Sequence, residues 1–318
     1  MYLGDKIILI TGATGFIGAN LARRCVEMGA VVHVFTRATS NMWRIADLLP
    51  KVTDWRVDLL NYKETEKAVS QIQPHIIFHT ATYGGYPFQK ENADIIQTNV
   101  MGTVNLVTAC SKTKFELFVN TGSSSEYGIK PHSISECEML EPVSTYGVAK
   151  AAASLFCRMK ALTENLPIVT LRLFSPYGYY EEFTRLVPSA IISVLRGENP
   201  KFSRPDSVRD FVFIEDVVNS YIKTLKNKHE IQGKIFNIGY GLQHSVRDVV
   251  STVVQLTGEK VTPQWGAVPN SRREPTTWQA DISRAKNELG WRPDHDLATG
   301  LTKTIAWFRN NMELIREK

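Results

Sequence analysis

Short apolar segments alternate with amphipathic segments through the first half of the 318-residue chain. The apolar segments are rich in Val, Ile and Phe and are apolar on both faces, which is typical of strands in a buried parallel sheet. Their alternation with helical patterns predicts an α/β fold with a doubly wound parallel sheet. The predicted strands are 6–11, 31–36, 54–57, 75–79, 117–121 and 168–174, and the predicted helices are 17–28, 63–71, 94–111 and 145–165.

The pattern loosens after residue 175. Tyr, Pro, Gly and Arg gather between 176 and 210, and shorter helical patterns follow at 215–226, 246–257 and 281–289. We expect residues 1–175, with returning segments near 209–240, to form the sheet domain. Residues 176–318 are expected to form a smaller, discontinuous cap over the carboxyl-terminal edge of the sheet, where ligands bind in such folds.

A glycine-rich loop, Thr11-Gly-Ala-Thr-Gly-Phe-Ile-Gly18, joins the first predicted strand to a helix. The first glycine allows a tight turn, the second lets the backbone approach a pyrophosphate at the helix N-terminus, and the third lets helix and strand pack closely. This pattern between a strand and a helix is typical of dinucleotide binding. We therefore expect a Rossmann domain that contacts an NAD-type cofactor through Gly12, Thr14, Gly15, Phe16 and Ile17.

The end of the second predicted strand should contact the adenosine ribose. An Asp or Glu there binds the 2′-hydroxyl of NAD, whereas a nearby Arg accommodates the 2′-phosphate of NADP. This chain has Thr36 and Arg37 and no carboxylate. The sequence thus favours NADP(H), with NAD as the alternative and a solvated Arg37 as the other interpretation. Asp58 and Leu59 follow the third strand, where the adenine would lie.

Tyr146 and Lys150 are four residues apart at the start of a predicted helix, so they share one face. An ammonium beside a phenol favours the phenolate, so we expect the pKa of Tyr146 to fall below its ordinary value of about 10. Such a phenol can exchange a proton with a hydroxyl or carbonyl. Ser123 follows the fifth strand and points into the ligand crevice. Ser123, Tyr146 and Lys150 are the predicted catalytic residues.

With these motifs the chain resembles an extended short-chain dehydrogenase/reductase of the nucleotide-sugar-modifying kind. The resemblance covers nearly the whole chain. It is carried by the glycine loop at 11–18, His-Thr-Ala-Thr at 79–82, Asn99, the serines at 123–125, Tyr146 with Lys150, and the segments 172–178, 209–211 and 289–293.

The resemblance implies roles for individual residues. Ser123 would bind the sugar O4, Tyr146 would be the acid/base, and Lys150 would tune it and bind the nicotinamide ribose. The cap would bind a nucleotide-diphosphate sugar. On the cofactor side the resemblance adds Thr80, Ala81 and Asn99, and on the substrate side it implies Ser124, Ser175, Arg209, Arg272, Arg273 and Glu274.

The resemblance also bears on the reaction. Sugar 4,6-dehydratases of this family place acidic residues one or two positions after the catalytic Ser or Thr, and this chain has Ser124 and Ser125 there. The segment 122–128 is similar to that of GDP-4-keto-6-deoxymannose reductases. We therefore expect NADPH-dependent reduction of a nucleotide-linked 4-keto-6-deoxy sugar. The alternative is a 4-epimerase with tightly bound NAD. A 4,6-dehydratase and a non-catalytic nucleotide-binding regulator are favoured less.

Composition narrows the possible partners. No apolar run is long enough to span a membrane and the N-terminus lacks signal-peptide features, so we expect a cytoplasmic protein. The net charge of +5 is scattered, which predicts no nucleic-acid partner but suits a small anionic ligand. The four cysteines are far apart and at no metal-binding spacing, which predicts no metal site.

Two helices, 94–111 and 145–165, carry more apolar and small residues than contact with one sheet requires. The resemblance implies a homodimer in which these helices form a four-helix bundle. A monomer that buries both apolar stripes internally is the alternative. The residues expected on the outer faces are Ile95, Val100, Gly102, Val107 and Ala109 on the first helix and Ala151, Ala152, Ala153, Leu155 and Phe156 on the second.

Overall fold

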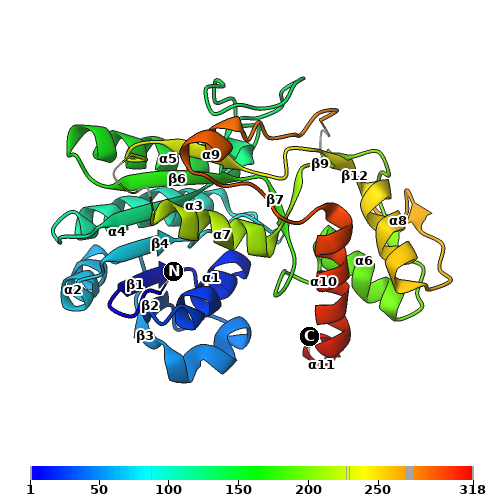
Figure 1. Ribbon diagram of the computed structural model, residues 1–318, viewed down its shortest axis with the longest axis horizontal. Helices are drawn as coiled ribbons and strands as arrows, with labels where there is room; N and C mark the ends of the chain where they lie inside the picture. Colours follow the sequence, from blue (N-terminus) through cyan, green and yellow to red (C-terminus); the bar gives the residue numbers. More distant parts are fainter. Residues whose placement is uncertain (1, 87, 227, 229, 270–274, 317–318) are drawn as a thin grey trace.

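A seven-stranded parallel sheet is the centre of the fold (Figure 1). The computed structural model describes residues 2–86, 88–226, 228, 230–269 and 275–316. The doubly wound sheet predicted from the sequence is confirmed, with strand order β3-β2-β1-β4-β5-β6-β11 and parallel pairing throughout. The strands are β1 (Ile7–Thr11), β2 (Val31–Thr36), β3 (Thr53–Arg56), β4 (Ile76–His79), β5 (Leu117–Ser123), β6 (Ile168–Leu173) and β11 (Ile235–Ile238).

Helices cover both faces of this sheet. Residues of α1 (Phe16–Glu27) and α7 (Ile214–Thr224) share one hydrophobic core, and residues of α2 (Tyr62–Ile72), α4 (Gly102–Cys110) and α5 (Thr145–Thr163) share the other. Within β1, Ile8 and Ile10 face the first core and Leu9 faces the second. Burial on both faces is the reason that the strands are apolar at successive positions.

The second part of the chain returns to the sheet with α7 and β11, and much of the remainder gathers as a cap at one end of the sheet (Figure 1). Its helices α6 (Leu186–Leu195), α8 (Val246–Thr257) and α10 (Leu297–Asn310) pack on one another. Short strand pairs link it together: β7 (Ser175–Tyr177) with β10 (Phe211–Phe213), β9 (Val208–Arg209) with β12 (His244–Ser245), and β8 (Lys201–Phe202) with β13 (Gln264–Trp265). The remaining short elements are η1 (Trp43–Lys51), α9 (Ser283–Glu288) and α11 (Glu313–Arg316).

The sequence did not predict two of the cap helices, α6 and α10. Pro188 lies in the first turn of α6, where a proline is tolerated because its missing N–H has no partner within the helix. The N-cap of α10 is Asp296, which accepts a hydrogen bond from the N–H of Thr299 at 2.8 Å. No helix among the described residues is both long and apolar enough to cross a bilayer.

A π-helical turn interrupts the predicted helix at 94–111. The segment consists of α3 (Asn92–Ile96), the π turn η2 (Gln97–Met101) and α4. A π turn holds one residue more than an α turn, so it rotates the residues that follow it relative to a regular helix. Asn99 lies within the turn.

Several residues expected on the outer surface are in fact buried inside the protomer. Their burial within the protomer shows that the predicted stripe was wrong in its detail. Buried are Ile95, Gly102, Val107, Ala109, Ala151 and Ala153, whereas Ile96, Met101, Val148, Leu155, Met159 and Leu162 are exposed.

The buried carboxylate of Asp210 links three segments of the chain. It lies between β9 and β10 and is fully buried. It accepts hydrogen bonds from the backbone N–H groups of Tyr240 at 2.5 Å, Gly241 at 3.0 Å and Ala280 at 2.9 Å. The loop after β11 and the segment before α9 are therefore both held by one side chain.

Replacing this carboxylate should destabilise the protein. In Asp210→Asn, one oxygen becomes an NH₂ group that cannot accept from N–H, so buried donors lose their partner. We expect the free energy of unfolding to fall by about 2–3 kcal/mol in urea titrations. Asp206→Asn, at a side chain that is 87% exposed, is the matched control and should change little. Equal stability of the two variants would contradict this role.

Candidate functional site

The glycine loop forms a close turn at the carboxyl end of β1. Gly12 has a positive φ of +70°, and a Cβ there would lie 2.5 Å from the backbone nitrogen of Ala81. A Cβ on Gly18 would meet the carbonyl oxygen of Gly12. Helix α1 then begins after the N-cap Gly15 with no side-chain cap and no acidic residue in its first turn. Phe16 and Ile17 start this helix, whose N–H groups and positive dipole end suit an anion.

A cavity of about 100 Å³ continues from this loop along the ends of β2 and β3. Arg37 is exposed at its edge, and Asp58 accepts a hydrogen bond from the N–H of Leu60 at 3.0 Å. Ser40 and Thr98 also line the cavity and were missed from the sequence. The cradle of the glycine loop and this cavity together fit an adenine dinucleotide. Of the expected contacts, the cavity brings together Gly12, Thr14, Thr36, Arg37, Asp58, Leu59 and Ala81.

Thr36, which lines this cavity, is buried, and its hydroxyl is hydrogen-bonded to an acidic side chain. Its hydroxyl donates to Asp54 Oδ1 at 2.5 Å, and Asp54 also pairs with Arg56 at 3.0 Å. Arg56 in turn donates to the carbonyl oxygen of Arg37 at 2.9 Å. The carboxylate of Asp54 is therefore paired within the protein.

A buried polar network lies under the loop that follows β4. Thr80 donates to the carbonyl of Thr11 at 2.7 Å. His79 contacts the hydroxyls of Thr11 at 2.7 Å and Thr103 at 2.9 Å. Burial lowers the pKa of His79 to about 3, with the charge of Lys150 adding to the effect.

Asn99 holds this loop in place. Its Oδ1 accepts from the Thr82 hydroxyl at 2.9 Å and from the N–H of Tyr83 at 3.0 Å, and its Nδ2 donates to the carbonyl of Tyr83 at 2.6 Å. The sequence predicted Asn99 as a cofactor contact. Both acceptor positions of its amide oxygen are used by residues 82 and 83, and its contact with a cofactor stays a prediction.

Ser123, Tyr146 and Lys150 meet at the carboxyl ends of β5 and β4. Ser123 ends β5, and its hydroxyl accepts from the N–H of Ser125 at 3.1 Å in the 3₁₀ turn η3 (Ser124–Glu126). Tyr146 is the second residue of α5, and the hydroxyls of Thr82 and Ser123 act to lower the pKa of its phenol, against the larger effect of burial. Lys150 follows one turn later and is buried.

The electrostatics of Tyr146 differ from the prediction. Burial raises the pKa of the phenol above its ordinary value, and the charges that act on it are those of Glu126 and Arg185. Burial also lowers the pKa of Lys150, which lies within the field of Glu126. Desolvation is therefore the largest effect on the pKa of the phenol. The expectation that Lys150 draws the pKa of Tyr146 down was wrong for the protein by itself.

The carboxylate of Glu126 is held by hydrogen bonds within the protein. It is fully buried, and it accepts from the N–H of Ser123 at 2.8 Å, from Ser154 at 3.0 Å and from Arg172 at 2.6 Å. Ser124, expected to contact substrate, is buried beside it. Directly after Ser123, the predicted catalytic serine, the site thus has no free carboxylic acid.

The predicted substrate residues lie on different elements. Ser175 is half-buried at the start of β7, with its N–H on the carbonyl of Asp210 at 3.0 Å. Arg209 lies at 5.7 Å from the ring centre of Trp278 and donates to the carbonyl of Val208 at 2.6 Å. Arg272, Arg273 and Glu274 lie outside the described residues.

Two arginines that the sequence did not single out join the loops around the site. Arg185, the N-cap of α6, donates to the carbonyl of Gly85 at 3.4 Å. Arg44 is buried in η1 and contacts the carbonyls of Tyr180 at 2.6 Å and Thr14 at 3.4 Å, and the carboxylate of Glu182 at 3.2 Å. No short motif marks either residue, because their partners come from distant segments.

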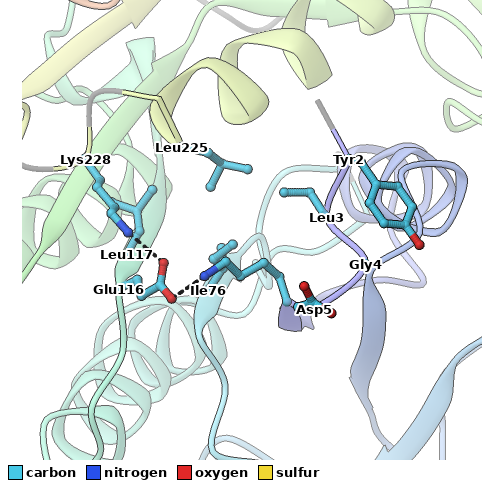
Figure 2. A pocket seen from close by; sticks show the side chains of 10 residues that line it. Tyr2, Leu3, Gly4, Asp5, Ile76, Glu116, Leu117, Leu225 and Lys228 are labelled. Atoms are coloured by element: carbon cyan, nitrogen blue, oxygen red, sulfur yellow. Dashed lines mark hydrogen bonds and ion pairs between the residues drawn. The ribbon is translucent and has the colours of Figure 1, made fainter.

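A second cavity, of about 270 Å³, lies at the opposite edge of the sheet, where β4 and β5 begin (Figure 2). Glu116 in it pairs with Lys6 at 2.5 Å and Lys228 at 2.7 Å. The charges there are paired within the protein, and the cavity is remote from Ser123 and Tyr146. The carboxyl edge of the sheet is therefore the candidate active site.

Comparisons with known proteins agree with this geometry. The family model described as "NAD dependent epimerase/dehydratase family" matches residues 8–239. An uncharacterized UDP-glucose epimerase, YtcB, of Bacillus subtilis is 30% identical over 94% of this chain and 97% of the relative. The dTDP-glucose 4,6-dehydratase of Escherichia coli is 24% identical over 96% of this chain and 94% of the relative. A crystal structure of UDP-glucuronic acid 4-epimerase from Bacillus cereus, in complex with UDP-glucuronic acid and NAD, superposes with a TM-score of 0.85 at 26% identity, covering 96% of this chain and 99% of that one.

The buried, neutral His79 should make the protein sensitive to acid. Its pKa is about 3 in the folded state and 6.5 for an ordinary histidine, so between these values the unfolded chain binds the extra proton. The stability contribution is complete above pH 6.5 and is lost as the pH falls, by up to about 1.4 kcal/mol per pH unit.

Urea unfolding at pH 7, 6 and 5 measures this slope. His79→Asn should reduce the slope, whereas His132→Asn, at a side chain that is 54% exposed, should keep it. An unchanged slope in His79→Asn would show that other groups cause the acid sensitivity.

Proposed function

The chain belongs to the NAD-dependent epimerase/dehydratase family and is an enzyme of the extended short-chain dehydrogenase/reductase type, and from this we propose that it is a 4-epimerase of a nucleotide-linked hexose that works with tightly bound NAD. The proposal takes up the alternative that the sequence left open. The expected NADPH-dependent 4-keto reductase finds no support in the comparisons.

The observation that carries the proposal is the meeting of Ser123, Tyr146 and Lys150 beside the glycine loop, without a free acid next to the serine. A 4,6-dehydratase would need a group that protonates the leaving C6 hydroxyl. Ser124 and Ser125 stand at those positions, and Glu126 is held by Arg172. A 4-epimerase needs only proton exchange at O4, which Ser123 and Tyr146 can supply.

The relatives support a UDP-sugar as the substrate class and NAD as the cofactor. The relative from Bacillus subtilis is described as a UDP-glucose epimerase, and the solved 4-epimerase from Bacillus cereus holds UDP-glucuronic acid and NAD. Arg37 was the reason to favour NADP(H). Because Arg37 is exposed and its carbonyl holds Arg56, we assign it no discrimination against NAD.

The proposed reaction assigns a task to each residue. NAD, held by the glycine loop and the cavity beside it, would supply the hydride acceptor and donor for C4. Ser123 donates to the sugar O4 and orients it, and Tyr146 takes the O4 proton as the hydroxyl becomes a carbonyl, then gives it back. Lys150 lies one helical turn from Tyr146, where it would contact the nicotinamide ribose. The glycine loop would bind the pyrophosphate of the cofactor, and Ser175 and Arg209, at the boundary between the sheet domain and the cap, would contact the nucleotide-linked sugar.

The decisive experiment follows C4 by NMR. Purified protein, without added cofactor, is incubated separately with UDP-glucose, UDP-galactose and UDP-glucuronic acid. In a second measurement the protein is denatured, and the nicotinamide cofactor that it releases is identified. We expect catalytic turnover to the C4 epimer and release of NAD. Tyr146→Phe should reduce the rate 10²–10⁴-fold or more while retaining NAD, because the phenol moves a proton and contributes little to cofactor binding.

A reductase would behave differently in the same assay. It would consume one NADPH per 4-keto sugar and leave UDP-glucose unchanged. Tyr146→Phe with more than half of the wild-type rate would overturn the assignment of the acid/base. Tyr62→Phe, at a half-buried phenol on α2 whose partner is Glu66, is the matched control.

We also propose that two copies pair through the outer face of α3, η2, α4 and α5. This face exposes a group of large apolar side chains that the protomer does not cover. Leu155 is 52% exposed and Leu162 is 64% exposed. A two-fold contact that buries both helices of each copy would form a four-helix bundle and keep the protein dimeric.

Charge on this face should separate the copies. Leu155→Lys with Leu162→Lys places four like charges in the pair, so light scattering should show monomers at micromolar concentration. Leu256→Lys, at an exposed leucine on α8, should leave the dimer intact. A wild-type mass that stays near 35.8 kDa as concentration rises would rule out the dimer.

A further inference from the structure

Gly147 directly follows Tyr146 in the first turn of α5, at a point where another segment lies very close to the helix. It is buried, and its N–H donates to the hydroxyl of the N-cap Ser144 at 3.1 Å. A Cβ at this position would overlap the carbonyl oxygen of Ser125 and would lie 2.9 Å from the Cβ of Pro142. The backbone of η3 therefore approaches α5 more closely than any side chain at this position would permit.

Glu126 provides a second contact between η3 and the same helix. Its Oε1 accepts a hydrogen bond from the hydroxyl of Ser154 at 3.0 Å. Gly147 and Ser154 are seven residues apart, which is two helical turns, so they lie on one face of α5. Lys150 lies between them on this face and is buried. The 3₁₀ turn thus contacts α5 at two points, one on each side of the lysine.

The hydroxyl of Ser123 is hydrogen-bonded to the part of the turn that contacts Gly147. Ser123 Oγ accepts from the N–H of Ser125 at 3.1 Å, and the carbonyl of Ser125 is the group that lies against Gly147. The N–H of Ser123 donates to Glu126 Oε1 at 2.8 Å. The position of Ser123 relative to Tyr146 therefore depends on how closely η3 packs on the first turn of α5.

We propose that Gly147 is a positioning residue for the chemistry at C4: because it has no side chain, the turn that carries Ser123 packs directly on the helix that carries Tyr146, and this contact sets the separation of the two groups. The catalytic consequence rests on the proposed function, whereas the contact belongs to the protein itself. A misplacement of about 1 Å at the reacting groups can cost about 10²-fold in rate. A methyl group between η3 and α5 should therefore slow catalysis although it touches neither substrate nor cofactor.

The first test is Gly147→Ala, the smallest change that places a Cβ between the two elements. The overlap is with backbone atoms of Ser125, which cannot swing aside as the end of a flexible side chain could, so the turn has to shift. We expect kcat for C4 epimerisation to fall about 10²-fold, with KM for the UDP-sugar within about twofold of wild type and with bound NAD retained. A fall in kcat at constant KM is the signature of misplaced reacting groups in a folded protein.

Amide hydrogen exchange, followed by mass spectrometry on the purified holoenzyme, measures the turn itself without any turnover. The peptide that contains η3 should exchange faster in Gly147→Ala than in the wild type, because the hydrogen bonds of Ser125 and Glu126 weaken when the turn is displaced. The peptide that contains the glycine loop should be unchanged. Gly102→Ala is the matched control: it also adds a methyl group to a helical glycine, but the nearest atom there is the Cβ of Leu59 at 3.4 Å, an ordinary contact.

Several results would overturn the inference. These are a kcat of Gly147→Ala within about twofold of wild type, unchanged exchange in η3, or a rise in KM and a loss of NAD that accompany the fall in kcat and show a merely structural role. If Gly147→Ala does not accumulate as folded protein, Ser154→Ala decides, because it removes the second contact without adding an atom: a lower kcat at constant KM supports the inference, and an unchanged kcat overturns it. Absence of C4 epimerisation in the wild type would instead defeat the proposed function, and hydrogen exchange would still show whether Gly147 holds the turn.

Discussion

One buried carboxylate, that of Glu126, sets the positions of the groups that form the candidate site. It joins the turn after β5 to α5 through Ser154 and to β6 through Arg172, and it binds the backbone of Ser123 itself. A charge in the interior is stable only when such partners surround it, and the removal of a single partner costs about 3–5 kcal/mol. The ion pair thus fixes the serine against the helix that carries the tyrosine and the lysine.

Much of this arrangement could be predicted from the sequence because it depends on local patterns. The first six strands of the sheet follow the apolar segments closely, and the glycine loop lies where its spacing placed it. Ser123, Tyr146 and Lys150 were predicted because strand ends and helical spacing bring them to one edge. These inferences need only the order of elements and the rule that parallel strands end at the same side of a sheet.

The rest depends on properties that no local pattern contains. Burial has the largest effect on the pKa of Tyr146, and burial cannot be read from the spacing of Tyr146 and Lys150. The outer face predicted for 94–111 assumed a regular helix, whereas η2 adds a residue and turns the side chains that follow it by about 100°. The burial of Ile95, which precedes η2, has no such cause. The hydrogen bonds of Asn99 with Thr82 and Tyr83 could not be predicted from the sequence, because only the folded loop brings these residues together.

Arg44 couples the conformation of the glycine loop to that of the segment that contains Tyr180 and Glu182. Its guanidinium touches a carbonyl of the glycine loop at Thr14, a carbonyl at Tyr180 and the carboxylate of Glu182, so neither segment can shift without straining the other. Any ligand that stabilises one of these segments in its present conformation therefore also favours the other. By thermodynamic reciprocity, the affinity gained at the first site on filling the second equals the gain at the second on filling the first. A dinucleotide and a sugar nucleotide held on either side of Arg44 would in this way strengthen each other's binding without touching.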